Sequence, residues 1–268
     1  MLGDMGTWNI ALLGLAVTAT LGVLTWIASL VQHDASLVDR MWSMLIAGAA
    51  AVYAVALPRP DARTFWMLGL VAVWAVRLCV YITARNWGHG EDRRYQAIRA
   101  RNQPNFALKS LVLVFGLQAV LAWIVSMPFL VGMGSAAPLS VLDYAGIVIA
   151  VFGIIFEAVG DAQMATFKRD PRNGGQVMDR GLWRYTRHPN YFGETCVWWG
   201  VWLVALSGSG LSGAWTVISP VLMTVLLLKV SGVTLLERDI NERRPAYRDY
   251  IARTNPFFPG KPRAKDPA

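Results

Sequence analysis

The run WNIALLGLAVTATLGVLTWIASLV, residues 8–31, decides the fold class because it is long, apolar and uncharged. Its 24 residues would extend about 36 Å as an α-helix, more than the roughly 30 Å of hydrocarbon in a bilayer. Similar runs follow at 41–57, 64–83, 107–131, 139–162, 191–207 and 213–236. We therefore predict an all-α, multi-pass integral membrane protein with about seven transmembrane helices.

Lysines and arginines alternate between rich and poor connections. The third connection holds five arginines from Arg85 to Arg101, and the fifth holds six basic residues from Lys168 to Arg187, whereas 132–138 and 208–212 hold none. The positive-inside rule then places the N-terminus outside and the third connection, the fifth connection and the C-terminus in the cytoplasm. In a bacterium this membrane would be the cytoplasmic (inner) membrane.

The composition narrows the possible partners. A formal charge of +8 accompanies 55% hydrophobic and 16% charged residues, and the charge follows the topology, so we expect membrane lipid and no nucleic acid as a partner. The two cysteines and three histidines lack ligand spacing, which argues against a disulfide framework or a metal site. We expect one membrane domain over 1–258 and a disordered tail at 259–268.

The stretch DRGLWRYTRHPNYFGE, 179–194, collects hydrogen-bonding side chains at the cytoplasmic end of an expected helix. Pro189 fixes the approach to that helix, and Asn190 stands near its N-terminus, where free backbone N–H groups attract anions. This arrangement predicts a seat for a polar ligand. The alternative for Arg187 and His188 is simple anchoring to lipid headgroups.

Ionisable residues inside apolar helices are costly, which makes them site candidates. They are Arg77, Glu157, Asp161, Glu194, Lys229 and Glu237. Glu157 and Asp161 share one helical face, and Arg77, Tyr81 and Arg85 form a stripe toward the cytoplasm that suits a phosphate. The alternative is that these groups form ion pairs that lock the helix bundle.

Two further features are site candidates, and each also has a purely structural explanation. Asp39 opens the second run, where an aspartate is common for capping and dipole reasons alone. Tyr247 and Tyr250 are interleaved with arginines near the C-terminus, as in a stacking floor for a nucleobase or in a solvated amphipathic helix. Both explanations stay open on the sequence.

Together these stretches resemble the bacterial, DUF1295-like branch of the steroid 5α-reductase family, and more distantly the sterol C14 and C7 reductases. The resemblance covers nearly the whole chain. It is carried by SLVDRMW (36–42), the stripe at 77–86, the acidic face ending at Asp161, GLWRY (181–185), HPNYFGE (188–194) and the segment 237–259. It implies a seven-helix membrane oxidoreductase, active in lipid metabolism, that uses NADPH to reduce the C=C bond of an α,β-unsaturated ketone, such as a 3-oxo-Δ4 steroid.

The same resemblance implies a set of cofactor contacts. They are Arg77, Arg85, Asn86, Asp161, Lys168, Tyr185, Asn190 and Glu194, with His188 from the same motif, and Arg238, Asp239 and Tyr247 aligned across a gap. Arg85 and Lys168 offer cations for a 2′-phosphate, so we expect NADPH to be preferred to NADH.

Ketone activation needs its own donor, because hydride transfer to the β-carbon leaves negative charge on the ketone oxygen. Asp39 falls where the family places a ketone-polarising Glu, and is the catalytic candidate, with Tyr53 and Tyr81 on nearby helices as alternatives. The family's partner Tyr corresponds here to Trp74, which has no phenolic proton.

Two other functions compete with a reductase. A membrane methyltransferase of the isoprenylcysteine carboxyl type, with S-adenosylmethionine as donor, shares the R-H-P-x-Y motif followed by Glu at a helix start. The stripe at 77–86 favours the reductase, because it suits phosphates that the methyl donor lacks. A transporter or non-enzymatic lipid-binding protein would predict an internal repeat and paired broken helices, and the sequence shows neither.

Overall fold

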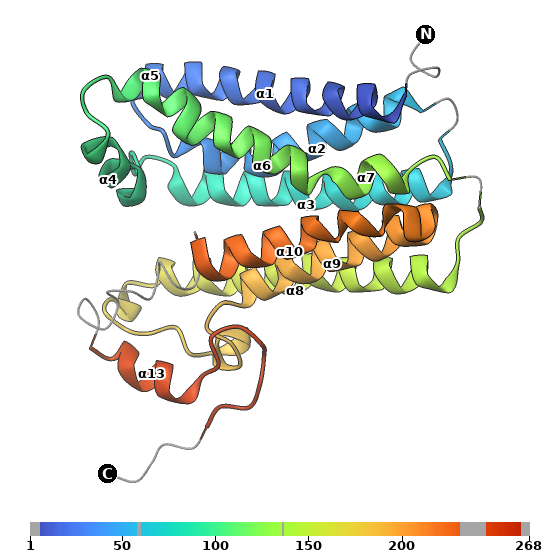
Figure 1. Cartoon of the computed structure of the whole chain (residues 1–268). Coiled ribbons are helices and arrows are strands. Elements are labelled where there is room, and N and C mark those ends of the chain that lie inside the picture. Colours follow the sequence, from blue (N-terminus) through green and yellow to red (C-terminus); the bar gives the residue numbers. More distant parts are fainter. Residues whose placement is uncertain (1–5, 58–59, 136, 231–244, 264–268) are drawn as a thin grey trace. The chain divides into compact units, whose positions relative to one another are not determined.

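The computed structural model describes residues 6–57, 60–135, 137–230 and 245–263, and helices are the regular elements of this part of the chain (Figure 1). It divides into two compact units, Met1–Ile147 with Val201–Ser219, and Val148–Gly200 with Pro220–Ala268. The predicted single domain over 1–258 stays a prediction. Of the expected disordered tail, residues 264–268 lie outside the described part.

In the first unit, α1 Thr7–Gln32, α2 Leu37–Ala56 and α3 Ala62–Asn86 pack in sequence order, and α6 Leu117–Val125 packs on α1 and α2 (Figure 1). Shorter elements of this unit are α4 Arg93–Arg101, α5 Phe106–Ser110, the π-helix η1 Leu111–Gly116, α7 Met127–Gly132 and the 3-10 helix η4 Gly210–Val217.

The second unit takes most of two long helices, α8 Val141–Arg169 and α9 Pro189–Ser209, and most of α10 Ile218–Val225. Its shorter elements are the 3-10 turns η2 Pro171–Asn173 and η3 Gly181–Arg184, the π-helix η5 Leu226–Val230 and α13 Tyr247–Arg253.

Six helical stretches of the described residues are long and apolar enough to cross a membrane, which confirms the predicted all-α, multi-pass membrane fold. The sixth, Pro189–Val230, has 42 residues and covers both the sixth predicted span and the seventh as far as residue 230. One straight helix of that length would extend about 63 Å, twice the hydrocarbon thickness. The indole N–H of Trp199 donates to Thr224 Oγ1 at 3.3 Å, so α9 and α10 lie side by side after a reversal. The orientation of the ends stays a prediction.

The buried face of α1 is a stripe of small residues spaced three or four apart. They are Ala11, Gly14, Thr18, Gly22, Thr25 and Ser29, while Trp8, Leu24 and Val31 are exposed. Helices in lipid gain little from burying apolar side chains and associate through small residues that allow close approach. A Cβ at Gly14 would overlap the Tyr53 hydroxyl group, so α1 and α2 are in contact there.

The contact between α8 and α9 joins the backbone of one helix to the backbone of the other. A Cβ on Gly153 would lie 2.5 Å from the Gly193 carbonyl oxygen and 2.7 Å from the Val197 backbone nitrogen. A Cβ on Gly193 would lie 2.7 Å from the Glu157 backbone nitrogen. About two helical turns after Gly153 on α8, a Cβ on Gly160 would lie 3.1 Å from the Pro189 side chain. Three glycines therefore set the distance between these helices.

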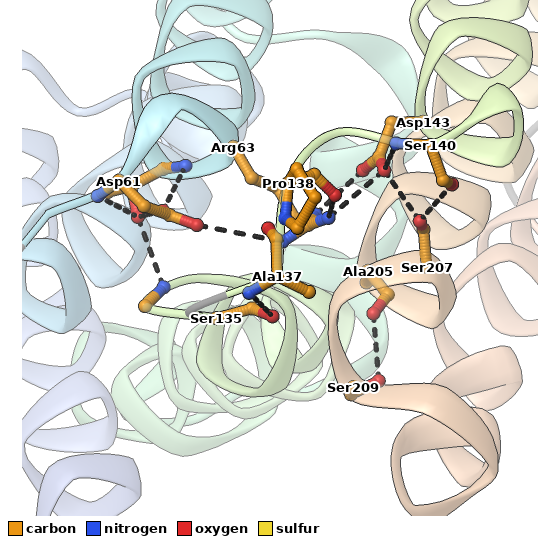
Figure 2. A network of polar contacts seen from close by, with 12 residues as sticks. Asp61, Arg63, Ser135, Ala137, Pro138, Ser140, Asp143, Ala205, Ser207 and Ser209 are labelled. Atoms are coloured by element: carbon orange, nitrogen blue, oxygen red, sulfur yellow. Dashed lines mark hydrogen bonds and ion pairs between the residues drawn. The ribbon is translucent and has the colours of Figure 1, made fainter.

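A buried ion pair joins the first turns of α3 and α8 (Figure 2). The guanidinium of Arg63 donates to both carboxylate oxygens of Asp143, at 2.7 and 3.0 Å, and both side chains are fully buried. The Asp143 carboxylate also accepts from the Ser140 backbone N–H at 2.8 Å and the Ser207 hydroxyl at 2.6 Å. With the carbonyl oxygens of Ala137 and Pro138 as further acceptors, the charges of this network are satisfied inside the protein.

Replacing Asp143 by Asn should strongly destabilise the protein, because it leaves the Arg63 guanidinium buried beside a neutral amide. Breaking a buried pair costs about 3–5 kcal/mol. The measurement is unfolding of the purified variant in detergent. The control is Asp170→Asn, which removes the solvent-exposed pair with Arg172 and should change stability little. Equal losses in the two variants would contradict the prediction.

Replacing Gly153 by Ala should also destabilise, because the added methyl meets backbone atoms that have no flexible side chain to move. Overpacking of this kind costs about 1–3 kcal/mol. The matched control is Gly69→Ala on α3, whose added Cβ would meet nothing within 4 Å. Thermal unfolding in the same detergent compares the two, and an unchanged midpoint for Gly153→Ala would show that the helices can separate freely.

Candidate functional site

Buried polar side chains gather where the glycine contact holds α8 against the start of α9. Glu157 and Asp161 of α8 are 2% and 4% exposed, and His188 and Glu194 at the start of α9 are 5% and 7% exposed. The His188 ring stacks on Tyr191, with ring centroids 5.3 Å apart and planes within 1°. Such groups are expensive inside a membrane protein, and they mark this end of the helix pair as a site.

Asn190, in the first turn of α9, carries a polar atom that the protein does not use. Its side-chain oxygen is buried and accepts no hydrogen bond from the described residues. The hydroxyl of Thr195, further along α9, is in the same state. A buried acceptor without a donor costs about 1–3 kcal/mol, unless a ligand supplies the donor. Next to it, the first N–H groups of α9 have no helical acceptor.

The segment before α9 is fastened to the C-terminal segment. Arg187 donates to the carbonyl oxygens of Thr254 at 2.6 Å and Ile251 at 3.2 Å, and its backbone N–H donates to the Asn255 carbonyl oxygen. The Thr186 hydroxyl donates to the Phe257 carbonyl oxygen at 2.8 Å. Arg187 thus holds the C-terminal segment in place. The sequence suggested headgroup anchoring or ligand binding for this residue, and did not suggest this structural role.

The tail tyrosines follow the same pattern. Tyr250 is 1% exposed and its hydroxyl donates to the Trp183 carbonyl oxygen, so it packs the C-terminal segment on η3. Its ring meets Tyr247 edge to face at 5.1 Å. A nucleobase therefore cannot stack on Tyr250 as the structure stands, and Tyr247 remains the candidate of the two.

In the first unit, Asp39 lies in a hydrogen-bonded cluster with α4. One carboxylate oxygen accepts from the Tyr95 hydroxyl at 2.6 Å, and the other accepts from Arg94 at 2.7 Å. Gln118 of α6 donates to the Tyr95 hydroxyl oxygen at 3.1 Å. Burial, and then the negative charge of Asp39, raises the pKa of the Tyr95 phenol above its ordinary value, so the phenol stays protonated.

Glu91, which lies just before α4, links that helix to the segment before α2. Glu91 accepts from Arg99 at 2.7 Å and from the Ala35 backbone N–H at 2.9 Å. Burial opposes ionisation of this carboxyl, but the Arg99 hydrogen bonds, the Ala35 N–H and the Arg99 charge together lower its pKa. The anchored α4 presents Tyr95 to Asp39. The sequence reasoning missed Tyr95, although the charge-rich string EDRRY at 91–95 was a signal for it.

The three catalytic candidates do not form one group. Fourteen residues of α2 separate Asp39 from Tyr53, which is about 21 Å along a helix. The Tyr53 hydroxyl lies 3.1 Å from that of Ser126 and is buried against α1. Tyr81 lies near the end of α3, with the Arg85 guanidinium 5.8 Å from its ring centroid, and Arg85 donates to the Asn86 side chain at 3.0 Å.

The expected cofactor contacts are divided between the two units. Arg77, Arg85 and Asn86 are on α3 of the first unit, and Asp161, Lys168, Tyr185, His188, Asn190, Glu194 and Tyr247 are in the second. Within the second unit, the structure brings together Asp161, His188, Asn190 and Glu194. Lys168 and Tyr185 are exposed nearby in the chain. Arg238 and Asp239 lie outside the described residues.

Comparison with known proteins places the chain in a family. The family model described as "Protein of unknown function (DUF1295)" matches residues 25–254, from α1 to the end of α13. An uncharacterized protein of Schizosaccharomyces pombe is 23% identical over 279 residues, which cover 94% of this chain and 80% of the relative. No solved structure matches. This multi-span membrane protein belongs to the DUF1295 family.

Proposed function

We propose that the protein is a membrane-embedded reductase that uses NADPH to reduce the C=C bond of an α,β-unsaturated ketone, with a steroid or similar apolar lipid as substrate. The proposal joins the resemblance to steroid 5α-reductases with one observation, the buried and unsatisfied side-chain oxygen of Asn190 at the start of α9. That oxygen requires a donor, and a carboxamide N–H of a nicotinamide ring would be one.

The residues around Asn190 fit a cofactor with polar and charged parts. The Glu157, Asp161 and Glu194 carboxyl groups can accept from ribose hydroxyls and the carboxamide, and the first N–H groups of α9 can meet an anion. Lys168 is exposed at the end of α8 in the same unit, where it can pair with a phosphate. S-adenosylmethionine carries no phosphate with which this cation could pair.

The bound nicotinamide would supply a hydride to the β-carbon of the enone, and the negative charge would then develop on the ketone oxygen. Both oxygens of Asp39 accept hydrogen bonds here, so the proton donor of the cluster is the Tyr95 phenol. We assign ketone polarisation to the Asp39–Tyr95 pair, in which Tyr95 takes the part that Trp74 cannot play. Its single phenolic O–H, which donates to Asp39 here, would turn from the carboxylate to the ketone oxygen as charge develops there, while Arg94 keeps its hydrogen bond to Asp39.

The first test compares ligands by the thermal stability of the purified protein. NADPH should stabilise it, by about 2.7 kcal/mol at a concentration 100 times Kd, and S-adenosylmethionine should not. Asn190→Ala should weaken NADPH binding about three- to tenfold, because one hydrogen bond is lost. The control Asn9→Ala changes an exposed amide on α1 and should bind as the wild type does. Stabilisation by S-adenosylmethionine alone would favour the methyltransferase.

The second test concerns the Asp39–Tyr95 pair. Tyr95→Phe and Asp39→Asn should each lower the single-turnover rate of NADPH oxidation with a 3-oxo-Δ4 steroid about 10²- to 10³-fold, and NADPH binding should survive. The control is Tyr144→Phe, which changes an exposed tyrosine of α8. If both variants keep rates within a few-fold of wild type, Asp39 serves only at the start of its helix. Tyr81 would then be the next candidate for the ketone-polarising donor.

A further inference from the structure

A hollow of about 580 Å³ in the second unit is lined mostly by charged residues, and Asn190 is not among the lining residues. Its walls are Asp179, Arg180, Gly181, Arg184, Arg253, Thr254, Pro262 and Arg263. Four arginines thus face one space with a single carboxylate among the lining residues. That carboxylate is already engaged, because Asp179 pairs with Arg253 at 2.8 Å.

The hollow is built from two segments that are fixed to each other. One wall is the η3 segment, and the other is the stretch after α13, held by the Arg187 and Thr186 hydrogen bonds described above. The Gly260 N–H also donates to the Tyr185 carbonyl oxygen at 3.0 Å and so joins the two segments. Within the C-terminal wall, the Arg263 N–H donates to the Arg253 carbonyl oxygen at 2.8 Å. The arginines are therefore brought together by the fold, against their mutual repulsion.

Arg184 and Arg263 are the cations best placed to accept a ligand. Both are exposed, and neither forms an ion pair with a described residue. A guanidinium presents a planar fork of N–H donors that matches two phosphate oxygens, and charge-assisted bonds of this kind are the stronger ones. The volume is in the range of small-molecule sites and exceeds what one phosphate fills.

We propose that this hollow is a binding site for a phosphate-bearing ligand, distinct from the Asn190 region. The shared chemistry is a phosphate mono- or diester recognised by Arg184 and Arg263, with Arg180 and Arg253 raising the local positive potential. Two sources carry that group, the phosphates of a nucleotide and the headgroup of an anionic lipid at the membrane surface. The site does not require the proposed reductase activity, since it rests on the hollow and its charges alone.

The experiment measures inorganic pyrophosphate binding to the purified full-length protein in neutral detergent by calorimetry. Wild type should show saturable binding, and Arg184→Gln with Arg263→Gln should weaken it at least tenfold. The matched control, Arg93→Gln with Arg101→Gln, removes the same charge from exposed positions of α4 and should bind as wild type does. Unfolding midpoints without ligand show that each variant is folded. Lack of saturable binding in the wild type, or equal weakening in the control, would overturn the proposal.

Two further arms then identify the source. Adenosine 2′,5′-bisphosphate that displaces pyrophosphate from wild type assigns the site to a nucleotide. Stabilisation in phosphatidylglycerol nanodiscs over phosphatidylcholine nanodiscs, lost in the Arg184/Arg263 variant, assigns it to lipid. Because pyrophosphate binding needs neither hydride transfer nor an enone, a protein without reductase activity could still pass this test, and an active one could fail it.

Discussion

The backbone contact between α8 and α9 is the constraint on which the candidate site depends. Within a bilayer, two helices gain little by burying apolar side chains against each other, so their separation is decided by how closely the backbones can approach. Gly153, Gly160 and Gly193 allow a distance that no larger residue would permit. Because the helices are so close, Glu157 and Asp161 are buried near the first turn of α9. A wider spacing would expose these two side chains to lipid or water.

The protein treats buried polar groups in two different ways. The Arg63 guanidinium and the Asp143 carboxylate each form several hydrogen bonds within the protein. The groups of this network therefore satisfy one another, and the network stabilises the fold. At Asn190 a buried oxygen is left unsatisfied by the described residues. Buried polar atoms without a partner among the described residues also occur at Thr195 Oγ1 of α9 and Arg40 Nε of α2. Asn190 differs from these by its position in the first turn of α9, beside other buried charged side chains.

The sequence predicted the membrane fold well, because a run such as 8–31 can satisfy its backbone only as a helix once it is in lipid. Through the family resemblance, the sequence also singled out Asp161, His188, Asn190 and Glu194 as cofactor contacts, and that assignment stays a prediction. The sequence missed the roles of Arg187 and Tyr95. Both depend on acceptors from distant segments, the Thr254 carbonyl oxygen and the Asp39 carboxylate, and no local spacing reveals such partners. The buried pair of Arg63 with Asp143 was missed for the same reason, because 80 residues separate its members.

The interlock of Arg187 with the C-terminal segment also sets an order of events during biosynthesis. The carbonyl oxygens that accept from this guanidinium are 64 and 67 residues further along the chain. At a translation rate of about 5–20 residues per second, they are made roughly 3–13 seconds after Arg187 itself. During that interval α9 can already enter the membrane, while the cation beside its first turn faces water or lipid phosphate. The N-terminal end of α9 is thus completed only when the C-terminal segment, which is synthesised last, folds back onto it. A nascent chain that ended before this segment would insert its helices and still lack the contacts that complete the site.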